Sequence, residues 1–456
     1  MGRLKIEDIV QATGGTVLCG KAEKFSGLSI DSRSIREGEL FVALKGERFD
    51  GHDFLAAALT NGAGALVQVP PAELPAEKTL ILVKDTLIAL QALARYLRSG
   101  MNLAVIGVTG TNGKTTTKEL ISSVFGQRHK VLKTTGNLNN HIGLPLCITR
   151  MDGDEDIMVL EMGSNHRGEI KQLCEIALPD FCIVTNVGPA HIEGFGSLEA
   201  IRDTDLEILG YAKTASVNAD DAFLLEGTKN YGGRLITYGM KNTADVYAKE
   251  IMLGTRGSGF KLCFSDKRMI AVNLQLSGRV NVYNALAAAS VANALGVGLE
   301  DIKYGLESFG GVPMRLEIKE MSGALVISDV YNANPASMEE ALKELVRLKR
   351  KRTIAVLGDM LELGSYAEEA HRKLVRLASE MKIDTLIAVG PEMKKAAKEF
   401  RGACFEAEDS DGARSVLSDI FDKGDAILIK GSRGMRMEKV LGEAGTPGTG
   451  EVSNAL

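Results

Sequence analysis

One glycine-rich segment carries the strongest chemical signal in the chain, G-V-T-G-T-N-G-K-T-T-T at residues 107–117. An apolar run precedes it and an amphipathic pattern follows it, which predicts a strand, a tight turn and a helix beginning at Lys114. The turn's amides, the helix N-terminus and the lysine would face one anion, as in a phosphate loop for ATP or GTP, although Val108 replaces the usual first glycine. The residues expected to contact the nucleotide are Thr109, Gly110, Thr111, Asn112, Gly113, Lys114, Thr115 and Thr116.

Two further residues could complete a magnesium site beside this loop. Glu161 closes the apolar run I-M-V-L-E, and His191 follows the run F-C-I-V-T-N-V-G-P-A. Each alone would more often be structural, but the carboxyl ends of parallel strands meet at one edge of a sheet. With the Thr115 hydroxyl, the carboxylate and the imidazole suit a Mg²⁺ ion that also holds substrate oxygens. We therefore expect Thr115, Glu161 and His191 to be metal ligands.

The elements that must position these residues follow an α/β pattern. From residue 101, apolar runs alternate with glycine turns and amphipathic stretches, as in a parallel sheet of the phosphate-loop ATPase type. The same alternation restarts near Ala324 and predicts a second doubly wound unit, while residues 1–99 contain shorter mixed segments. We expect three α/β domains, at residues 1–99, 100–313 and 314–456, with a frayed tail at 443–456.

Composition excludes several classes of protein. The 456 residues are 45% hydrophobic and 25% charged, which is typical of a folded globular chain. A net charge of -5 provides no basic excess for a nucleic acid or an anionic membrane surface. There is no apolar run long enough for a membrane span and no apolar leader segment, so we expect a cytoplasmic protein. The six cysteines are scattered without metal-binding spacing, which favours buried free thiols.

Several ordered motifs resemble the Mur ligases over essentially the whole chain. The N-terminal motifs D-S-R and F-V-A-L-K-G-E-R-F-D-G-H-D-F are similar to the family's first domain. Within the family, Y-N-A-N-P and G-D-M-L-E-L-G look like the branch that adds D-alanyl-D-alanine. The other motifs are T-G-T-N-G-K-T-T-T-K-E, T-T-G-N-L-N-N-H-I-G-L-P-L, N-V-G-P-A-H-I-E-G-F-G-S, N-V-Y-N-A-L-A-A-A and K-G-S-R-G-M-R-M-E.

The resemblance implies an ATP-dependent ligase of three domains. The first would hold a UDP-sugar, the second would bind ATP, and a Rossmann-like C-terminal domain would bind the incoming amine and close over the nucleotide. The substrates would be UDP-N-acetylmuramoyl-tripeptide, with lysine or diaminopimelate as third residue, and D-alanyl-D-alanine. The reaction would pass through an acyl phosphate, and we expect a monomer.

The resemblance also assigns roles to individual residues. It implies that Glu161 and His191 are magnesium ligands, that Asn284 contacts adenine, and that Arg315 and Asp329 reach the nucleotide from the domain junction. With Asp205, the expected catalytic residues are Lys114, His191 and Arg315. The motifs that would contact the UDP-muramoyl peptide contain Ser32, Arg33, Asn139 and Asn140, although a plain turn is the alternative for the two asparagines; His52 and His371 are expected to be structural.

Three positions depart from the family's pattern. Asp205 stands where the family has a carbamylated lysine that holds a second magnesium, Val280 replaces a histidine, and Ser328 replaces an aspartate. The carboxylate of Asp205 lies nearer the backbone than a carbamate would, so we hypothesise that it acts on the second ion through water. Two alternatives remain open: a catalytically weakened protein that binds nucleotide and UDP-sugar, and a sibling ligase with another amine acceptor.

Overall fold

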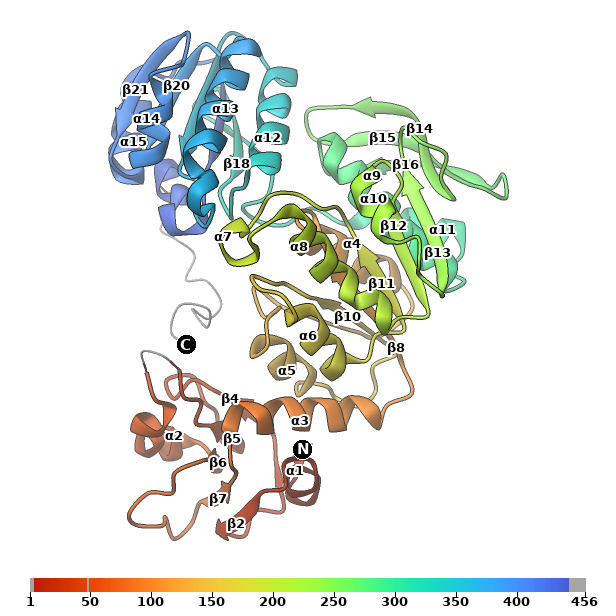
Figure 1. The fold of residues 1–456 in the computed structure, drawn as a ribbon, viewed down its shortest axis with the longest axis vertical. Helices are drawn as coiled ribbons and strands as arrows, with labels where there is room; N and C mark the ends of the chain where they lie inside the picture. Colours follow the sequence, from red (N-terminus) through yellow and green to blue (C-terminus); the bar gives the residue numbers. More distant parts are fainter. Residues whose placement is uncertain (1–3, 47–48, 443–456) are drawn as a thin grey trace.

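The computed structural model describes residues 4–46 and 49–442, so the tail expected at 443–456 lies outside the described residues. The described chain forms three α/β units in sequence order, each built on its own sheet (Figure 1). The N-terminal unit and the C-terminal unit lie at opposite ends, with the central unit between them (Figure 1). The α/β class with successive parallel sheets is confirmed.

The N-terminal unit contains a five-stranded sheet in the order β2-β7-β6-β5-β4, in which only β2 is antiparallel. Its last helix, α3, begins where the Asp85 side chain accepts a hydrogen bond from the Ile88 amide at 2.8 Å. Leu90 and Leu93 of α3 are buried in this unit's core. The elements are β1 (Leu4–Lys5), α1 (Ile6–Thr13), β2 (Thr16–Cys19), β3 (Lys24–Phe25), β4 (Gly27–Ser29), β5 (Glu39–Val42), α2 (Leu55–Asn61), β6 (Gly64–Val67), β7 (Thr79–Leu82) and α3 (Thr86–Ser99).

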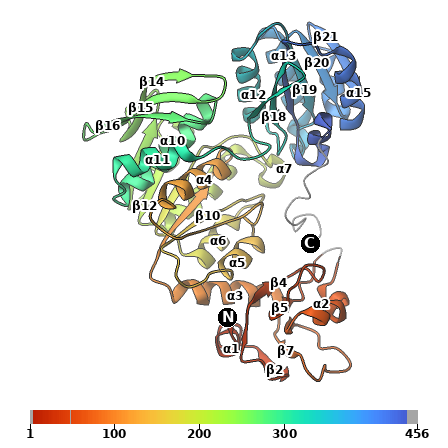
Figure 2. The same cartoon turned by 180° about the vertical axis from the view of Figure 1, so that it is seen from behind.

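The central unit is built on a nine-stranded sheet in the order β16-β15-β14-β13-β12-β11-β8-β10-β9. The parallel strands β8, β10 and β11 at the middle of this sheet are apolar runs buried on both faces, as expected for strands covered by helices on each side. One face is covered by α4, α10 and α11 (Figure 2), and the other by α5 and α6 (Figure 1). The helices are α4 (Lys114–Phe125), α5 (Gly143–Ile148), α6 (Glu169–Ala177), α7 (Ile192–Phe195), α8 (Leu198–Asp205), α9 (Ala222–Gly227), α10 (Arg279–Ala294) and α11 (Leu299–Ser308).

An antiparallel extension of this sheet was not predicted from the sequence. Strands β14, β15 and β16 pair antiparallel beyond the last parallel pair, β13 and β14. Their alternating burial differs from the continuous burial of the parallel strands, because one face of the hairpins is exposed. The strands are β8 (Ala104–Thr109), β9 (Val131–Lys133), β10 (Ile157–Glu161), β11 (Phe181–Val184), β12 (Thr214–Asn218), β13 (Arg234–Gly239), β14 (Val246–Leu253), β15 (Ser258–Phe264) and β16 (Met269–Leu274).

The C-terminal unit is the doubly wound sheet predicted from the repeated strand and helix patterns. Its six strands run in the order β17-β18-β22-β19-β20-β21, and only β17 is antiparallel. The elements are β17 (Glu317–Met321), β18 (Ala324–Asp329), α12 (Pro335–Arg347), β19 (Thr353–Gly358), α13 (Ala367–Glu380), β20 (Thr385–Val389), α14 (Pro391–Ala397), β21 (Ala403–Ala407), α15 (Ser410–Ile420) and β22 (Ala426–Lys430).

The cysteines agree with the sequence prediction in part. All six are free thiols, and Cys147 of α5, Cys174 of α6 and Cys182 of β11 lie in the core between these helices and the sheet. Burial was predicted for all six, but Cys404 is exposed and Cys19 is only half-buried, because both lie on strands at sheet edges. Among the described residues, no helix is both long and apolar enough to cross a membrane.

Candidate active site

The glycine-rich segment forms the predicted strand, turn and helix. Strand β8 ends at Thr109 and α4 begins at Lys114, with Gly113 as its N-cap at a φ of 85°. Gly110 has a φ of 116°, and a Cβ atom there would lie 2.3 Å from Thr185 Oγ1. A Cβ atom on Gly113 would lie 2.4 Å from Asn284 Oδ1. Both glycines are therefore required by conformation and by close approach, and they leave the helix N-terminus open toward an anion.

The Lys114 ammonium folds back onto its own loop. Its Nζ atom donates to the carbonyl oxygens of Gly110 at 2.5 Å and Thr111 at 3.1 Å. Burial lowers the pKa of Lys114, while the carboxylates of Asp205 and Glu161 act in the opposite direction. The Lys114 ammonium therefore lies at the loop, where it could exchange these two carbonyl oxygens for the oxygens of a bound phosphate group.

Residues that directly follow β11 hold the loop in place, and sequence reasoning missed them. Thr185 Oγ1 donates to the Asn112 carbonyl oxygen at 2.7 Å, and Asn186 Nδ2 donates to the same oxygen at 2.9 Å. Asn186 Oδ1 accepts from the Asn112 amide at 3.1 Å, and Thr111 Oγ1 accepts from the Gly188 amide at 2.8 Å. Thr185 and Asn186 are the first polar residues after a buried strand, so the strand-end rule that selected Glu161 could also have found them.

Glu161 lies at the end of β10 as predicted, and its side chain is only 4% exposed. Asn139 Nδ2 donates to Oε1 at 2.9 Å. The other oxygen, Oε2, has no hydrogen-bond partner among residues 4–46 and 49–442, and the Lys118 ammonium is 4.0 Å from it. A buried carboxylate oxygen without a partner, on the sheet edge that carries Thr115, fits the oxygen chemistry that Mg²⁺ requires.

His191 is held by the C-terminal unit. Its backbone is left-handed, with a φ of 51°, and Nδ1 lies 2.5 Å from Glu362 Oε2. Hydrogen bonding to His191 lowers the pKa of Glu362. The structure therefore pairs His191 with Glu362 rather than with Glu161 in this conformation.

Asp205 lies directly beneath the phosphate loop. It is the last residue of α8 and only 4% exposed, and Thr109 Oγ1 donates to its Oδ1 at 2.8 Å. Burial raises the pKa of Asp205 to about 6, although the nearby Lys114 charge and the hydrogen bond from Thr109 lower it. This short carboxylate is thus used by the protein itself to anchor the first residue of the loop.

The other predicted nucleotide residues lie on both sides of the junction between the central and C-terminal units. Asn284 lies beside Gly113 and accepts a hydrogen bond from Thr117 Oγ1 at 3.3 Å. The Arg315 guanidinium stacks 4.1 Å from the ring centre of Tyr331, and its buried Nε has no partner among the described residues. Asp329 is bound by the Lys430 ammonium at 2.6 Å.

The residues predicted to bind the UDP-muramoyl peptide come from two units, Ser32 and Arg33 from the N-terminal unit and Asn139 and Asn140 from the central unit. Ser32 and Arg33 lie in the turn after β4, where Arg33 forms an ion pair with Asp31 at 2.8 Å. Asn139 contacts Glu161, whereas Asn140 Oδ1 accepts from the Gly143 amide at 2.8 Å and so begins α5. The turn interpretation therefore describes the contacts of Asn140 in this structure.

The two histidines expected to be structural have such contacts. His52 Nε2 accepts from the Gln68 amide at 3.0 Å, and its Nδ1 lies 2.6 Å from Asp50. His371 is fully buried, and its Nε2 accepts from the Met360 amide at 2.9 Å.

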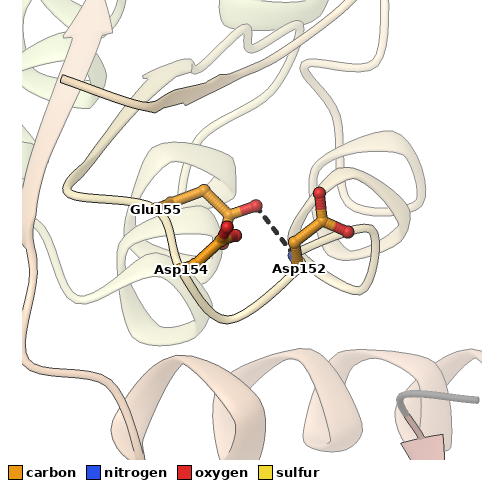
Figure 3. A group of neighbouring side chains, drawn as sticks. All are labelled: Asp152, Asp154 and Glu155. Carbon is orange, nitrogen blue, oxygen red and sulfur yellow. Dashed lines mark hydrogen bonds between the residues drawn. The ribbon is translucent and has the colours of Figure 1, made fainter. Parts of the chain in front are cut away.

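A separate group of carboxylates lies at the opposite end of the central sheet. Asp152, Asp154 and Glu155 lie close together in the loop that leads into β10 (Figure 3). The Lys130 ammonium pairs with both aspartates. Because this loop precedes β10 whereas the phosphate loop follows β8, the group is remote from the nucleotide site.

Comparison with known proteins decides the family. The chain is 37% identical over 452 residues to the UDP-N-acetylmuramoyl-tripeptide--D-alanyl-D-alanine ligase of Bacillus subtilis, covering 96% of this chain and 97% of that protein. This chain belongs to the Mur ligase family. The Escherichia coli protein of the same name is 36% identical, with 91% and 92% of the two chains covered. The family predicted from the motifs is thereby confirmed.

Family models and solved structures agree with this assignment. The Mur ligase family catalytic domain matches residues 24–98, the Mur ligase middle domain matches 108–292, and the Mur ligase glutamate ligase domain matches 314–433. A crystal structure of MurF from Acinetobacter baumannii superposes with a TM-score of 0.89 at 33% identity, covering 96% of this chain and 98% of that one. MurF from Thermotoga maritima in complex with ADP gives 0.83 at 32% identity, covering 91% and 96%.

Proposed function

We propose that this Mur ligase adds D-alanyl-D-alanine to UDP-N-acetylmuramoyl-tripeptide at the expense of ATP, in cytoplasmic synthesis of peptidoglycan precursors. The observation that carries the proposal is a phosphate loop whose helix has no side-chain N-cap, in a chain that matches D-alanyl-D-alanine-adding relatives over nearly their full length. The ADP in the Thermotoga maritima relative supports ATP as the nucleotide. We propose that the enzyme acts as a monomer.

The proposed reaction has two steps that the site can support. The carboxylate of the tripeptide attacks the γ-phosphorus of ATP, which forms an acyl phosphate and releases ADP. The amine of D-alanyl-D-alanine then attacks the acyl carbon, an amide bond forms, and inorganic phosphate leaves. Both reactants of the first step are anions, so positive groups must offset their repulsion. Lys114 provides such a charge when its ammonium exchanges two loop carbonyls for phosphate oxygens.

The residues near the phosphate loop also fit a magnesium ion. Thr115, Glu161 and His191 would hold it, and when bound it would neutralise charge on the phosphates. Of these, Glu161 offers a buried oxygen without a protein partner. Asp205 would act toward a second ion through water, because its carboxylate lies nearer the backbone than a lysine carbamate would, and its Oδ1 accepts a hydrogen bond from Thr109. Arg315, Asp329 and Asn284 would contact the nucleotide, and Ser32, Arg33, Asn139 and Asn140 the UDP-muramoyl peptide.

Release of ADP that depends on D-alanyl-D-alanine tests the proposed function. The purified protein should release ADP only when ATP, UDP-N-acetylmuramoyl-tripeptide, Mg²⁺ and the dipeptide are all present. Lys114→Ala should lower the rate at least about a hundredfold, the scale of losing one charged transition-state contact. No release above background at saturating magnesium and nucleotide would contradict the proposal.

One observation favours a second candidate function, a weakened protein that still binds nucleotide and UDP-sugar. Asp205 stands at the position of the family's carbamylated lysine, and its carboxylate accepts a hydrogen bond from Thr109. If Asp205→Lys raised a slow turnover, the weakened protein would be the better description. A dipeptide profile in which another amine is preferred would instead indicate a sibling ligase.

A further inference from the structure

Two asparagines from different units form reciprocal hydrogen bonds at the phosphate loop. Asn334 Nδ2 donates to Asn112 Oδ1 at 2.8 Å, and Asn112 Nδ2 donates to Asn334 Oδ1 at 3.3 Å. Asn112 belongs to the loop between β8 and α4, whereas Asn334 is the N-cap of α12 in the C-terminal unit. Two antiparallel amide bonds define an angle as well as a distance, so this contact orients one unit on the other.

Each of the two asparagines is also anchored by hydrogen bonds within its own unit. The main chain of Asn112 is bound by Thr185 and Asn186, which leaves its side-chain amide directed away from the loop. Asn334 forms a capping box with Ser337: Asn334 Oδ1 accepts from the Ser337 amide at 2.9 Å, and Ser337 Oγ accepts from the Asn334 amide at 3.0 Å. Because the capping box already fixes the Asn334 side chain, it is mainly the Asn112 side chain that loses rotamer freedom when the pair forms.

A second contact holds the other end of the same helix. The Arg347 guanidinium donates to the carbonyl oxygens of Leu253 at 2.9 Å and Gly254 at 3.0 Å, both in the central unit. The Ser277 hydroxyl donates to the buried Glu344 carboxylate at 2.8 Å. Helix α12 therefore lies along the junction with the central unit, with its N-terminus at the phosphate loop, and both views show it on that side of the C-terminal unit (Figures 1 and 2).

We propose that Asn112 and Asn334 are positioning residues, an interdomain clasp that seats the C-terminal unit over the phosphate loop for the reaction. The loop amides and Lys114 bind the nucleotide, and the clasp does not. The clasp affects the rate of the step that needs groups from both units. The inference rests on the proposed ligase activity for its kinetic readout alone.

Serine substitutions test the clasp without removing other functions of the two residues. Asn334→Ser keeps a favourable N-cap for α12, but its hydroxyl is too short to reach Asn112. Asn112→Ser leaves the main-chain bonds to Thr185 and Asn186 in place. Asn230→Ser, at an exposed position outside the junction, is the matched control. The four proteins needed besides wild type are the two single variants, their double variant and the control.

If the clasp acts as proposed, its loss should lower kcat and leave the affinity for ADP nearly unchanged. Each single variant should lower kcat for dipeptide-dependent ADP release about tenfold, as expected for losing two neutral hydrogen bonds. The dissociation constant for ADP, measured by calorimetry, should change less than about threefold in Asn334→Ser, because Asn334 lies outside the phosphate loop. The double variant should be no slower than the slower single variant, because both substitutions remove the same contact.

Three results would overturn the clasp: wild-type kcat in Asn334→Ser, multiplied losses in the double variant, or weaker ADP binding as the only effect of Asn112→Ser. The last result would make Asn112 a plain nucleotide contact. If the wild-type protein released no ADP, the proposed function would fail, and hydrogen exchange would decide the clasp. Asn334→Ser should then speed amide exchange in residues 110–113 relative to Asn230→Ser, and equal rates would refute the clasp.

Discussion

Lys118 places a positive charge inside the central unit, with its side chain only 1% exposed. Its ammonium donates to the Thr134 carbonyl oxygen at 2.6 Å, pairs with Glu119 at 2.9 Å and lies 4.0 Å from Glu161. Lys118→Met would leave the buried Glu161 carboxylate and the half-buried Glu119 carboxylate without this cation, and we expect it to lower the free energy of unfolding by about 3–5 kcal/mol. Urea unfolding without ligands measures this change.

Lys133→Met is the matched control for that measurement. Lys133 also pairs with Glu119, but its side chain is 39% exposed. Water replaces much of a lost surface contact, so we expect the control to cost less than about 1 kcal/mol. Equal effects of the two substitutions would contradict a special role for the buried ammonium.

Asp205 should make stability depend on pH. Burial raises its pKa from an ordinary value of 3.8 to about 6 in the folded protein. Folding thus favours the protonated form, and the resulting stabilisation is complete below about pH 4 and is lost as the pH rises through about 6. Asp205→Asn is always neutral, so its stability relative to wild type should rise by about 2.5 kcal/mol between pH 4 and pH 7.5, at about 1.4 kcal/mol per pKa unit.

Urea unfolding at several pH values, without nucleotide or divalent cations, measures this difference between wild type and Asp205→Asn. Asp203→Asn is a suitable control, because Asp203 is exposed on the same helix and its pairing with Arg202 is at the surface. A constant difference across the pH range for Asp205→Asn would show that burial does not perturb this carboxyl group.

At the scale of elements, the junction of the phosphate loop and α4 depends on Gly113. Gly113→Ala would place a side chain at a φ of 85° and within 2.4 Å of Asn284 Oδ1. The strain costs about 1–2 kcal/mol, and relief of the clash must displace either Asn284 or the helix N-terminus. We therefore expect ADP affinity to fall more than about tenfold, the equivalent of 1.4 kcal/mol.

Gly168→Ala is a control that introduces the backbone strain of a positive φ without a clash like that between residue 113 and Asn284. Gly168 is the N-cap of α6 with nearly the same φ, 83°, but a Cβ atom there meets nothing within 4 Å. This substitution should cost stability and leave ADP affinity unchanged. Calorimetric titration of both variants with ADP makes the comparison, and equal affinities would refute the structural role assigned to Gly113.

At the scale of the whole molecule, the units are joined by short segments that could act as hinges. Helix α3 ends at Ser99 and β8 begins at Ala104, while Met314 and Leu316 adopt left-handed backbone conformations between α11 and β17. Residues that absorb such backbone changes at element ends are typical of hinges. We predict large rotations about these segments when an ATP analogue and UDP-N-acetylmuramoyl-tripeptide bind together, with the N-terminus of α12 kept at the phosphate loop by Asn334.

Small-angle scattering should show this rotation as a lower radius of gyration with both ligands than with neither. An unchanged radius of gyration in the wild-type protein with both ligands bound would contradict the predicted rotation.

Local patterns were enough to predict the elements that carry the site. The apolar runs that form β8, β10 and β11 and the glycine turn before α4 depend on neighbouring residues, so the sequence indicates them directly. The rule that parallel strands end at one edge placed Glu161 near the phosphate loop. The antiparallel strands β14 to β16 escaped prediction, since their short alternating segments were not distinguished from the parallel ones.

By itself, the sequence determined the family, the α/β class and the identity of the phosphate loop, because these depend on residue types at fixed local spacing. Only the tertiary structure decided the partners of the key side chains: Asp205 with Thr109, His191 with Glu362, and Asn112 with Asn334. These pairs join residues far apart in the chain, and Asn112 and Asn334 are separated by 222 positions. Which side chains meet across such separations depends on how the units pack, and no local pattern specifies that packing.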